Sequence, residues 1–274
     1  MVEVRTGWER ERRTHFDEIV VNYDKARWEY PPEVFADIFD YARIGAKGTA
    51  LEIGAGTGKA TRPFLAAGCK VTAVELGENM AAFLQDKYQN DSKLSIIFSA
   101  FEDIELNASS YDIVYSASAF HWVDAGIGCP KVFNILKSKG VFALFRNNFI
   151  TSYELYEDLH DLYKLHYLSI YPRNTKKEPY TSVSLSQLSE IKRGFGFSGM
   201  EQFGFYDVNM RFYEARQSYS ATEYIALLET MADHRSLPES NKKALYTGIG
   251  ESINKRGGFC ELDFLFQLYI GRKP

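Results

Sequence analysis

Hydrophobic positions between residues 49 and 146 follow two alternating periods. Segments with apolar residues at helical spacing, such as RPFLAA, ENMAAFLQDKY and PKVFNILKS, alternate with short runs rich in Val, Ile and Ala. These short runs show little alternation, which is typical of strands buried on both faces; they cover residues 49–54, 69–75, 94–99, 111–117 and 140–145. Strands that alternate with helices predict a parallel sheet with helices on both sides. The pattern therefore predicts a doubly wound α/β core.

The segments on either side of this core carry different patterns. Residues 16–42 predict two helices that are separated at Pro31-Pro32. Pro31 disfavours the α region for Tyr30, whereas Pro32 suits the first turn of the second helix. After the core we expect, in order, a helix over 152–171, a short helix over 185–193, a strand near 203–212, helices over 221–234 and 238–256, and a closing strand over 260–272.

Composition and charge narrow the class of partner. With 45% hydrophobic and 25% charged residues, the 274-residue chain is typical of a globular protein that buries a core without disulfides. Its formal net charge of −4 argues against nucleic acid as a partner, because affinity for a phosphate backbone comes mostly from lysine and arginine.

The cysteines and the apolar segments of the chain indicate the cellular compartment that we expect for the protein. Cys69, Cys129 and Cys260 are scattered and form no C-x-x-C pair, so the chain suggests neither a disulfide framework nor a zinc site. The first 15 residues lack the apolar stretch of a signal peptide, and no apolar run approaches the roughly 18 residues of a membrane span. We expect a cytoplasmic protein with no membrane partner.

The most informative segment is LEIGAGTG, residues 51–58, at the end of the first predicted strand. Glycine at three alternate positions lets the backbone turn tightly and lets a ligand lie against it. A Walker loop is excluded, because Ala60 follows Gly58-Lys59 and Ile53 stands where its first glycine belongs. The interpretation of the loop as a dinucleotide-binding fingerprint is weakened, because Lys59 stands where that fingerprint has its third glycine.

A third interpretation comes from a resemblance. The pattern [ED]-x-G-x-G-x-G after the first strand, here from Glu52 to Gly58, resembles motif I of the class I methyltransferases. The runs FDEIVVNYDKARWEYPPEVF, YDIVYSASAFHWVD and ALLETMADHRSLPE are further similar to the type-11 methyltransferases of the trans-aconitate methyltransferase-like group. The resemblance spans nearly the whole chain and implies S-adenosyl-L-methionine as the cofactor.

The resemblance also implies a domain organisation. We expect a Rossmann-like fold with a mostly parallel seven-stranded sheet. Its parts are a helical N-terminal lid over residues 1–45, a cofactor-binding core over 46–150, a helical cap inserted after the fifth strand over 151–202, and a C-terminal part over 203–274 that completes the sheet and adds cap helices.

The resemblance assigns roles to residues at the strand ends. Glu75 ends the second strand and would accept the ribose hydroxyls, although dinucleotide enzymes use an acid at the same place. Tyr23 and Arg27 lie four residues apart and would close over the methionine carboxylate. The full cofactor set is Tyr23, Arg27, Glu52, Gly54, Ala55, Gly56, Thr57, Gly58, Glu75, Leu76, Met80, Ala100, Phe101, Glu102, Ser116 and Phe120.

Candidates for acceptor chemistry follow the fourth strand and lie in the cap. His121 is the best candidate for a general base, because an unperturbed imidazole titrates near pH 6.5; the alternative is that it orients substrate or packs beside Trp122. A tyrosine stripe that includes Tyr163 and Tyr167 either faces the core or roofs a pocket. The candidate substrate residues are Trp122, Tyr163, Tyr167 and His234. The five histidines form no metal-ligand cluster.

The expected function is methyl transfer from S-adenosylmethionine to a small-molecule acceptor, either a carboxylate or another polar metabolite. Such a transfer is an in-line displacement in which the protein mainly orients the cofactor and the substrate. Two alternatives stay open: a nicotinamide-dependent oxidoreductase, and a methyltransferase-fold protein that binds the cofactor without turnover. We expect a monomer or a homodimer.

Overall fold

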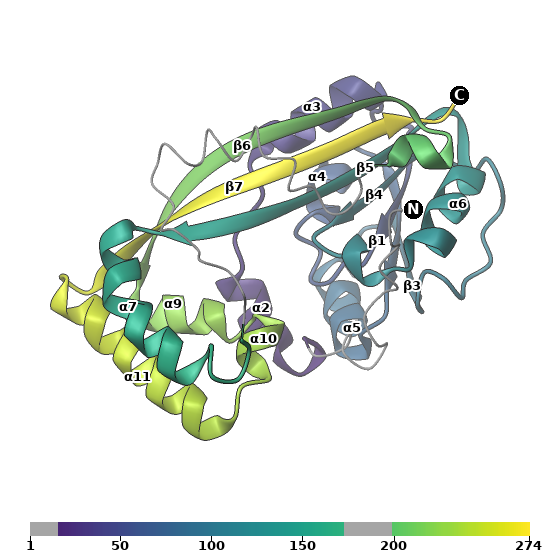
Figure 1. The fold of residues 1–274 in the computed structure, drawn as a ribbon. Helices are drawn as coiled ribbons and strands as arrows, with labels where there is room; N and C mark the ends of the chain where they lie inside the picture. Colours follow the sequence, from purple (N-terminus) through teal and green to yellow (C-terminus); the bar gives the residue numbers. More distant parts are fainter. Residues whose placement is uncertain (1–15, 173–198) are drawn as a thin grey trace.

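The strands form a single mostly parallel sheet of seven strands. The computed structural model describes residues 16–172 and 199–274 (Figure 1). The strand order is β3-β2-β1-β4-β5-β7-β6, and only β7 runs antiparallel to its neighbours β5 and β6. The strands are β1 (Thr49–Ile53), β2 (Lys70–Glu75), β3 (Leu94–Phe98), β4 (Tyr111–Ala117), β5 (Leu136–Thr151), β6 (Tyr206–Ser220) and β7 (Phe259–Arg272). The predicted doubly wound α/β fold is therefore confirmed.

Helices cover both faces of this sheet. Apolar residues of α3 and α4 pack on one face, with α5 beside β2 and β3, whereas α6 and η3 pack on the other face. The helices are α2 (Val20–Ala26), α3 (Pro32–Ala42), α4 (Thr61–Ala66), α5 (Glu78–Lys87), α6 (Ala125–Ile135), α7 (Tyr153–His166), α9 (Ala221–Leu228), α10 (Ala232–Arg235) and α11 (Glu239–Lys255), with the short 3-10 turns η1 (Asp17–Ile19), η2 (Phe120–Trp122) and η3 (Met200–Phe203).

The strands β5 and β6 are longer than the pattern predicts. The predicted strand over 140–145 is part of the 16-residue β5, because its far half pairs with β7 from Arg146 opposite Gln267 to Thr151 opposite Leu262. The strand predicted near 203–212 likewise extends to Ser220 along β7. Long-range pairing supplies the hydrogen bonds that local propensity does not signal.

A helical lobe sits at the far end of these long strands. In Figure 1, α7, α9, α10 and α11 gather there, and α2 from the N-terminal segment lies beside them. Two predicted helices end earlier than expected: the one over 152–171 stops at His166, and the one over 221–234 is broken between Leu228 and Ala232. The short helix predicted over 185–193 lies outside the described residues.

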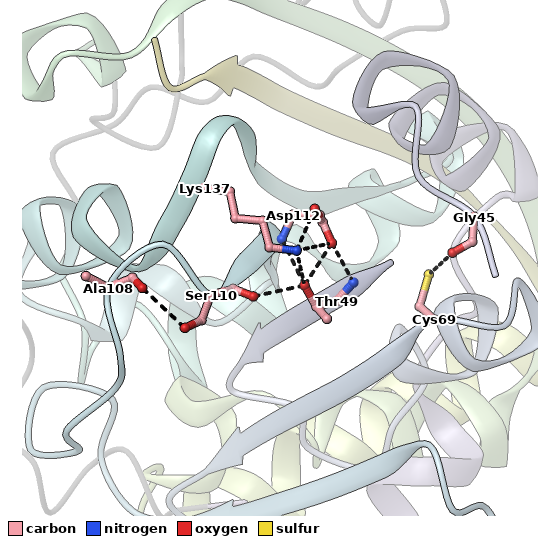
Figure 2. A network of polar contacts seen from close by, with 7 residues as sticks. All are labelled: Gly45, Thr49, Cys69, Ala108, Ser110, Asp112 and Lys137. Atoms are coloured by element: carbon pink, nitrogen blue, oxygen red, sulfur yellow. Dashed lines mark hydrogen bonds and ion pairs between the residues drawn. The ribbon is translucent and has the colours of Figure 1, made fainter. Parts of the chain in front are cut away.

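A polar network ties three strands together at the amino edge of the sheet (Figure 2). Lys137 Nζ lies 2.9 Å from both carboxylate oxygens of Asp112 and 3.1 Å from Thr49 Oγ1. Thr49 donates to Asp112 through its backbone N–H and its hydroxyl, both at 2.8 Å. Partial burial raises the pKa of Asp112, but the hydrogen bonds from Lys137 and Thr49 outweigh it and hold the pKa below its usual value. This edge lies opposite the strand ends where a ligand of a parallel sheet binds.

The described residues contain no helix that is both long and apolar enough to cross a membrane. Within the same ranges, no group of three or more His, Cys, Asp or Glu side chains is arranged to hold a metal ion. The three cysteines are buried and carry free thiols.

Candidate cofactor and acceptor site

The glycine loop after β1 adopts the backbone that only glycine tolerates well. Gly54, Gly56 and Gly58 have φ angles of +71°, +54° and +81°. A Cβ on Gly54 would lie 2.4 Å from the Cβ of Ala119, so the loop packs directly on the turn that follows β4. The N–H groups of Gly54 and Ala55 both donate to the carbonyl of Val74 at the end of β2. The loop is thereby fixed between the carboxyl ends of three strands.

A pocket opens over this loop, beneath the N-terminal lid. Four of its lining residues come from α2 and the segment after it, and two come from the end of β4. Its lining is Tyr23, Arg27, Trp28, Tyr30, Glu52, Gly54, Ala55, Gly56, Thr57, Lys59, Ala60, Ala117 and Ser118. Residues of the N-terminal segment and of the glycine loop thus line one pocket.

Glu52 is fully buried in the wall of this pocket. Its Oε2 accepts hydrogen bonds from Thr61 Oγ1 at 2.5 Å and from Tyr115 OH at 3.0 Å. Its Oε1 is also buried, and it has no hydrogen-bond partner among residues 16–172 and 199–274. Burial raises the pKa of the Glu52 carboxyl to about 8, against the lowering effect of Thr61 and Tyr115. A buried acid oxygen without a partner is costly unless a ligand supplies one.

Arg27 offers the complementary charge on the lid side of the same pocket. Its Nη2 donates to the carbonyl of Thr230, whereas its buried Nε finds no partner in the described part of the chain. α2 ends at Ala26, so Arg27 lies just beyond the helix, yet its guanidinium lies 4.9 Å from the centre of the Tyr23 ring. Two residues that line one pocket thus each have a buried polar atom without a partner in the described residues, a carboxyl oxygen and a guanidinium N–H, and such a pair suits a zwitterionic α-amino acid.

Glu75 occupies the end of β2 beside the loop. Its Oε2 accepts the N–H of Gly56 at 2.7 Å, and its Oε1 accepts the N–H groups of Leu76 and Gly77 at 2.9 and 2.8 Å. Burial raises the pKa of Glu75, while these three hydrogen bonds oppose the rise. These contacts fix the carboxylate at the carboxyl end of β2, beside the glycine loop.

The remaining residues of the predicted cofactor set lie around the same strand ends. Four of them are buried apolar residues: Met80, Ala100, Phe101 and Phe120. Leu76 and Glu102 are half-buried. The Oγ of Ser116 donates to the carbonyl of Ile53 at 2.7 Å and so ties β4 to β1. Lys131, which the sequence did not single out, donates to the carbonyls of Phe101, Glu102 and Ile104 and anchors the loop after β3.

The lid is attached to the core across the glycine loop. Glu29 accepts hydrogen bonds from Lys59 at 2.6 Å and from Arg62 at 3.0 Å. Lys87 Nζ bridges Asp24 on α2 at 2.9 Å and the carbonyl of Thr57 in the loop at 3.1 Å. Lys59, the residue that weakens the dinucleotide interpretation, therefore points to the lid.

The same lid is also attached to the helical lobe. Asn22 donates to the carbonyl of Ala226 on α9 at 3.2 Å, and Arg235 on α10 lies 3.0 Å from Glu18. Together with the bond from Arg27 to Thr230, these contacts join the lid to the lobe as well as to the core. The pocket is therefore lined by a segment that contacts both the core and the helical lobe.

His121 lies in η2, three residues after the pocket-lining Ser118. Although the side chain reaches solvent, desolvation by the surrounding protein, with the positive charges of Arg146 and Arg27, lowers its pKa to about 4. Arg146 is held at the end of the core part of β5, where its Nε donates to Gln267 Oε1 at 3.2 Å. The His121 ring lies 5.0 Å from that of Trp122. The positive charges of Arg27 in the lid and Arg146 in β5 thus contribute to the low pKa of this imidazole.

Known proteins share both the central sequence and the fold of this chain. Residues 51–144 match the family model of a methyltransferase domain. An uncharacterized methyltransferase from Schizosaccharomyces pombe is 24% identical over 85% of each chain. Residues 51–144 thus form a methyltransferase domain, and the chain is a methyltransferase.

Solved structures agree on the fold of this methyltransferase. A protein from Anaeromyxobacter dehalogenans named as a type II methyltransferase is 18% identical, with a TM-score of 0.65 over 90% of this chain and 97% of that one. A phosphoethanolamine N-methyltransferase from Haemonchus contortus, in complex with phosphomonomethylethanolamine and S-adenosylhomocysteine, is 16% identical, with a TM-score of 0.54 over 96% of this chain and 59% of that one. S-adenosylmethionine is the methyl donor of this class.

The predicted substrate residues of the cap lie together inside the helical lobe of the methyltransferase. The ring centroids of Tyr163 and Tyr167 are 5.8 and 5.3 Å from that of His234. The hydroxyl of Tyr167 donates to Asp233 at 2.5 Å. His234 also stacks on Tyr246 at 5.9 Å. The tyrosine stripe thus packs within the lobe, away from Trp122, which lies against Phe16 of the lid segment.

Several pocket residues were missed by sequence reasoning. Tyr30 donates from its hydroxyl to Ser118 Oγ at 2.9 Å, and its ring packs edge-on against Phe145. Ser118 itself has a φ of +55°, and its N–H donates to the carbonyl of Phe145. Trp28 also lines the pocket. A signal was available: Tyr30 precedes the double proline, and Ser118 lies within the run that follows the fourth predicted strand.

Proposed function

We propose that this methyltransferase transfers a methyl group from S-adenosylmethionine to a small-molecule acceptor. The observation that carries the proposal is a pair of buried polar atoms without a partner in the described residues, Glu52 Oε1 and Arg27 Nε, on two residues that line one pocket. The methionine end of the cofactor has an ammonium and a carboxylate, which match these two atoms. The Haemonchus contortus relative is in complex with S-adenosylhomocysteine, which supports the same ligand class here.

The residues of the pocket have separate tasks in this proposal. Glu52 would hold the α-ammonium, Arg27 the α-carboxylate, and Glu75 the ribose hydroxyls. The bound cofactor supplies an electrophilic methyl group on a sulfonium, so the protein needs to orient the two reactants and exclude water. The lid that spans the core and the lobe performs the exclusion, because it covers the glycine loop from above.

The proposed acceptor is a carboxylate or another polar metabolite. Support comes from His121, which lies in η2 just after β4, and from Arg146 within β5, whose positive charge acts on the His121 imidazole. A guanidinium that is fixed by Gln267 suits an anionic oxygen. Because the low pKa keeps the His121 imidazole neutral at pH 7, the ring can accept a proton from the acceptor or orient it. The similarity to the trans-aconitate methyltransferase-like group stays a prediction.

The test is thermal unfolding with S-adenosylmethionine, S-adenosylhomocysteine, NAD or NADP added separately. A ligand that binds only the native state adds about 2.7 kcal/mol at a hundred times its dissociation constant. We expect stabilisation by the two adenosyl sulfur compounds alone. Stabilisation by a nicotinamide cofactor instead would favour an oxidoreductase.

A second step tests turnover with a panel of small carboxylates and other polar metabolites. Formation of S-adenosylhomocysteine that depends on one of these acceptors is the expected result. Cofactor binding with no methylation of any acceptor would favour a methyltransferase-fold protein without turnover. The variant Arg27→Met should weaken S-adenosylhomocysteine binding, because it removes the partner of the cofactor carboxylate.

A further inference from the structure

We propose that Glu52 releases one proton when the cofactor binds, so that cofactor affinity in this methyltransferase depends on pH. The inference rests on the proposed function, because it takes the α-ammonium of the cofactor as the partner of Glu52. In the free protein the Glu52 carboxyl is neutral, and in the complex with the cofactor it is ionised.

The hydrogen bonds of Glu52 determine where its proton lies. Oε2 already accepts two hydrogen bonds, from the hydroxyls of Thr61 and Tyr115. The proton of the neutral acid therefore sits on Oε1, the oxygen for which the described residues provide no partner. With 0% of its surface exposed, the carboxyl has no water-accessible face through which a charge could be solvated.

The one charged group that acts on Glu52 in the described residues disfavours its ionised form: Glu75 on β2 adds a second carboxyl nearby and raises the Glu52 pKa. The hydroxyls of Thr61 and Tyr115 lower this pKa through their hydrogen bonds, but they carry no positive charge. The cations that line the pocket are engaged elsewhere, since Lys59 pairs with Glu29 and Arg27 donates to Thr230. Burial thus dominates and raises the pKa to about 8, so the carboxyl is mostly neutral at pH 7.

Ligand binding reverses this balance. When an α-ammonium takes its place beside Oε1, an opposite charge within hydrogen-bond distance favours the carboxylate. The O–H bond of Glu52 breaks, its electron pair stays on Oε1, and the proton passes to bulk solvent, while the ammonium keeps its own proton and forms the ion pair. An α-amino group titrates at about 7.7–8.0, so above that range the free ligand is neutral and binding takes up a proton instead.

The experiment is isothermal titration calorimetry with S-adenosylhomocysteine at pH 7, in two buffers that differ in ionisation enthalpy. The dependence of the observed enthalpy on the buffer should correspond to about one proton released per ligand bound. The dissociation constant should fall by about tenfold between pH 6 and pH 7. The matched ligand is 5′-methylthioadenosine, which keeps adenine, ribose and sulfur but lacks the amino-acid end; it should release almost no proton.

Two variants test whether the released proton comes from Glu52. Glu52→Gln resembles the neutral acid in shape, and it should bind S-adenosylhomocysteine more weakly and with no proton release. Glu75→Gln removes the neighbouring half-buried carboxyl; it should weaken both ligands but keep the proton release with S-adenosylhomocysteine. If Glu52→Gln does not fold, the comparison of the two ligands on the natural protein remains decisive.

The outcomes separate the two proposals. Binding of S-adenosylhomocysteine with no proton release, or an equal release with 5′-methylthioadenosine, would overturn the role of Glu52 while leaving the cofactor in place. Absence of any binding by S-adenosylhomocysteine would instead overturn the proposed function. Proton release that is confined to the ligand with an amino-acid end, and lost in Glu52→Gln, would support both.

Discussion

Gly56 offers a way to test whether the cofactor lies against the glycine loop. Its φ is +54°, and an added Cβ would meet no atom within 4 Å. The change Gly56→Ala therefore adds backbone strain without a clash in the ligand-free protein. A left-handed conformation costs a residue with a Cβ about 1–2 kcal/mol relative to glycine. At about 2–4 °C per kcal/mol for a domain of this size, the melting temperature should fall by roughly 2–8 °C.

Gly257 is the matched control for this strain. Its φ is +96°, and an added Cβ would also meet nothing within 4 Å, but it lies after α11, outside the pocket. Gly257→Ala should therefore cost similar or greater stability and leave ligand binding intact. Gly45→Ala, with open space and no positive φ, should change neither property.

The two alanine variants should differ in their response to S-adenosylhomocysteine. The open space above Gly56 is where we expect the ligand, so a methyl group there overpacks the complex by about 1–3 kcal/mol. That loss weakens binding by roughly 5- to 150-fold, since about 1.4 kcal/mol corresponds to tenfold. Thermal unfolding with and without ligand measures both effects. If Gly56→Ala gains as much stability from the ligand as Gly257→Ala does, the cofactor does not lie against this loop.

Three further predictions concern the lid, the acceptor side and the amino edge of the sheet. Glu29→Gln removes the exposed ion pairs to Lys59 and Arg62. Because such pairs contribute at most about 1 kcal/mol, the release of S-adenosylhomocysteine in stopped-flow measurements should become about 2- to 5-fold faster. The control Glu33→Gln should leave the release rate unchanged, and an unchanged rate in Glu29→Gln would contradict the lid attachment. If His121 is the general base, turnover on the acceptor found by the panel should fall as pH drops through about 4 rather than 6.5. The variant His121→Ala should then lose most of its turnover but still bind the cofactor. Retained turnover in this variant would show that His121 is not the general base. The pKa of Asp112 is lowered on folding, so its ion pair stabilises the protein above the ordinary carboxyl pKa and is lost as pH falls through the lowered value. Asp112→Asn should therefore cost about 1 kcal/mol in urea unfolding at pH 7, and an equal cost at pH 3 would refute the ion-pair account.

Local sequence was sufficient for the core of the fold and for the loop that carries the site. The strands predicted over 49–54, 69–75, 94–99 and 111–117 lie within one residue of those observed, because buried parallel strands are marked by short runs of branched apolar residues. The glycines at 54, 56 and 58 were expected to permit a tight turn, and all three have positive φ. Such features depend on steric rules within a few residues, so they can be read without a structure.

Contacts between distant residues could not be read in this way. The 16-residue length of β5 depends on its pairing with β7, whose partner residues follow more than 100 positions later. The meeting of Glu52 with Arg27 in one pocket depends on how a lid segment docks across the loop, and the bond from Arg27 to Thr230 spans 203 positions. The sequence by itself determined the α/β core and the chemistry available at the strand ends. Only the tertiary structure decided which of those groups are buried and left without a partner, because burial is a property of the whole packed molecule.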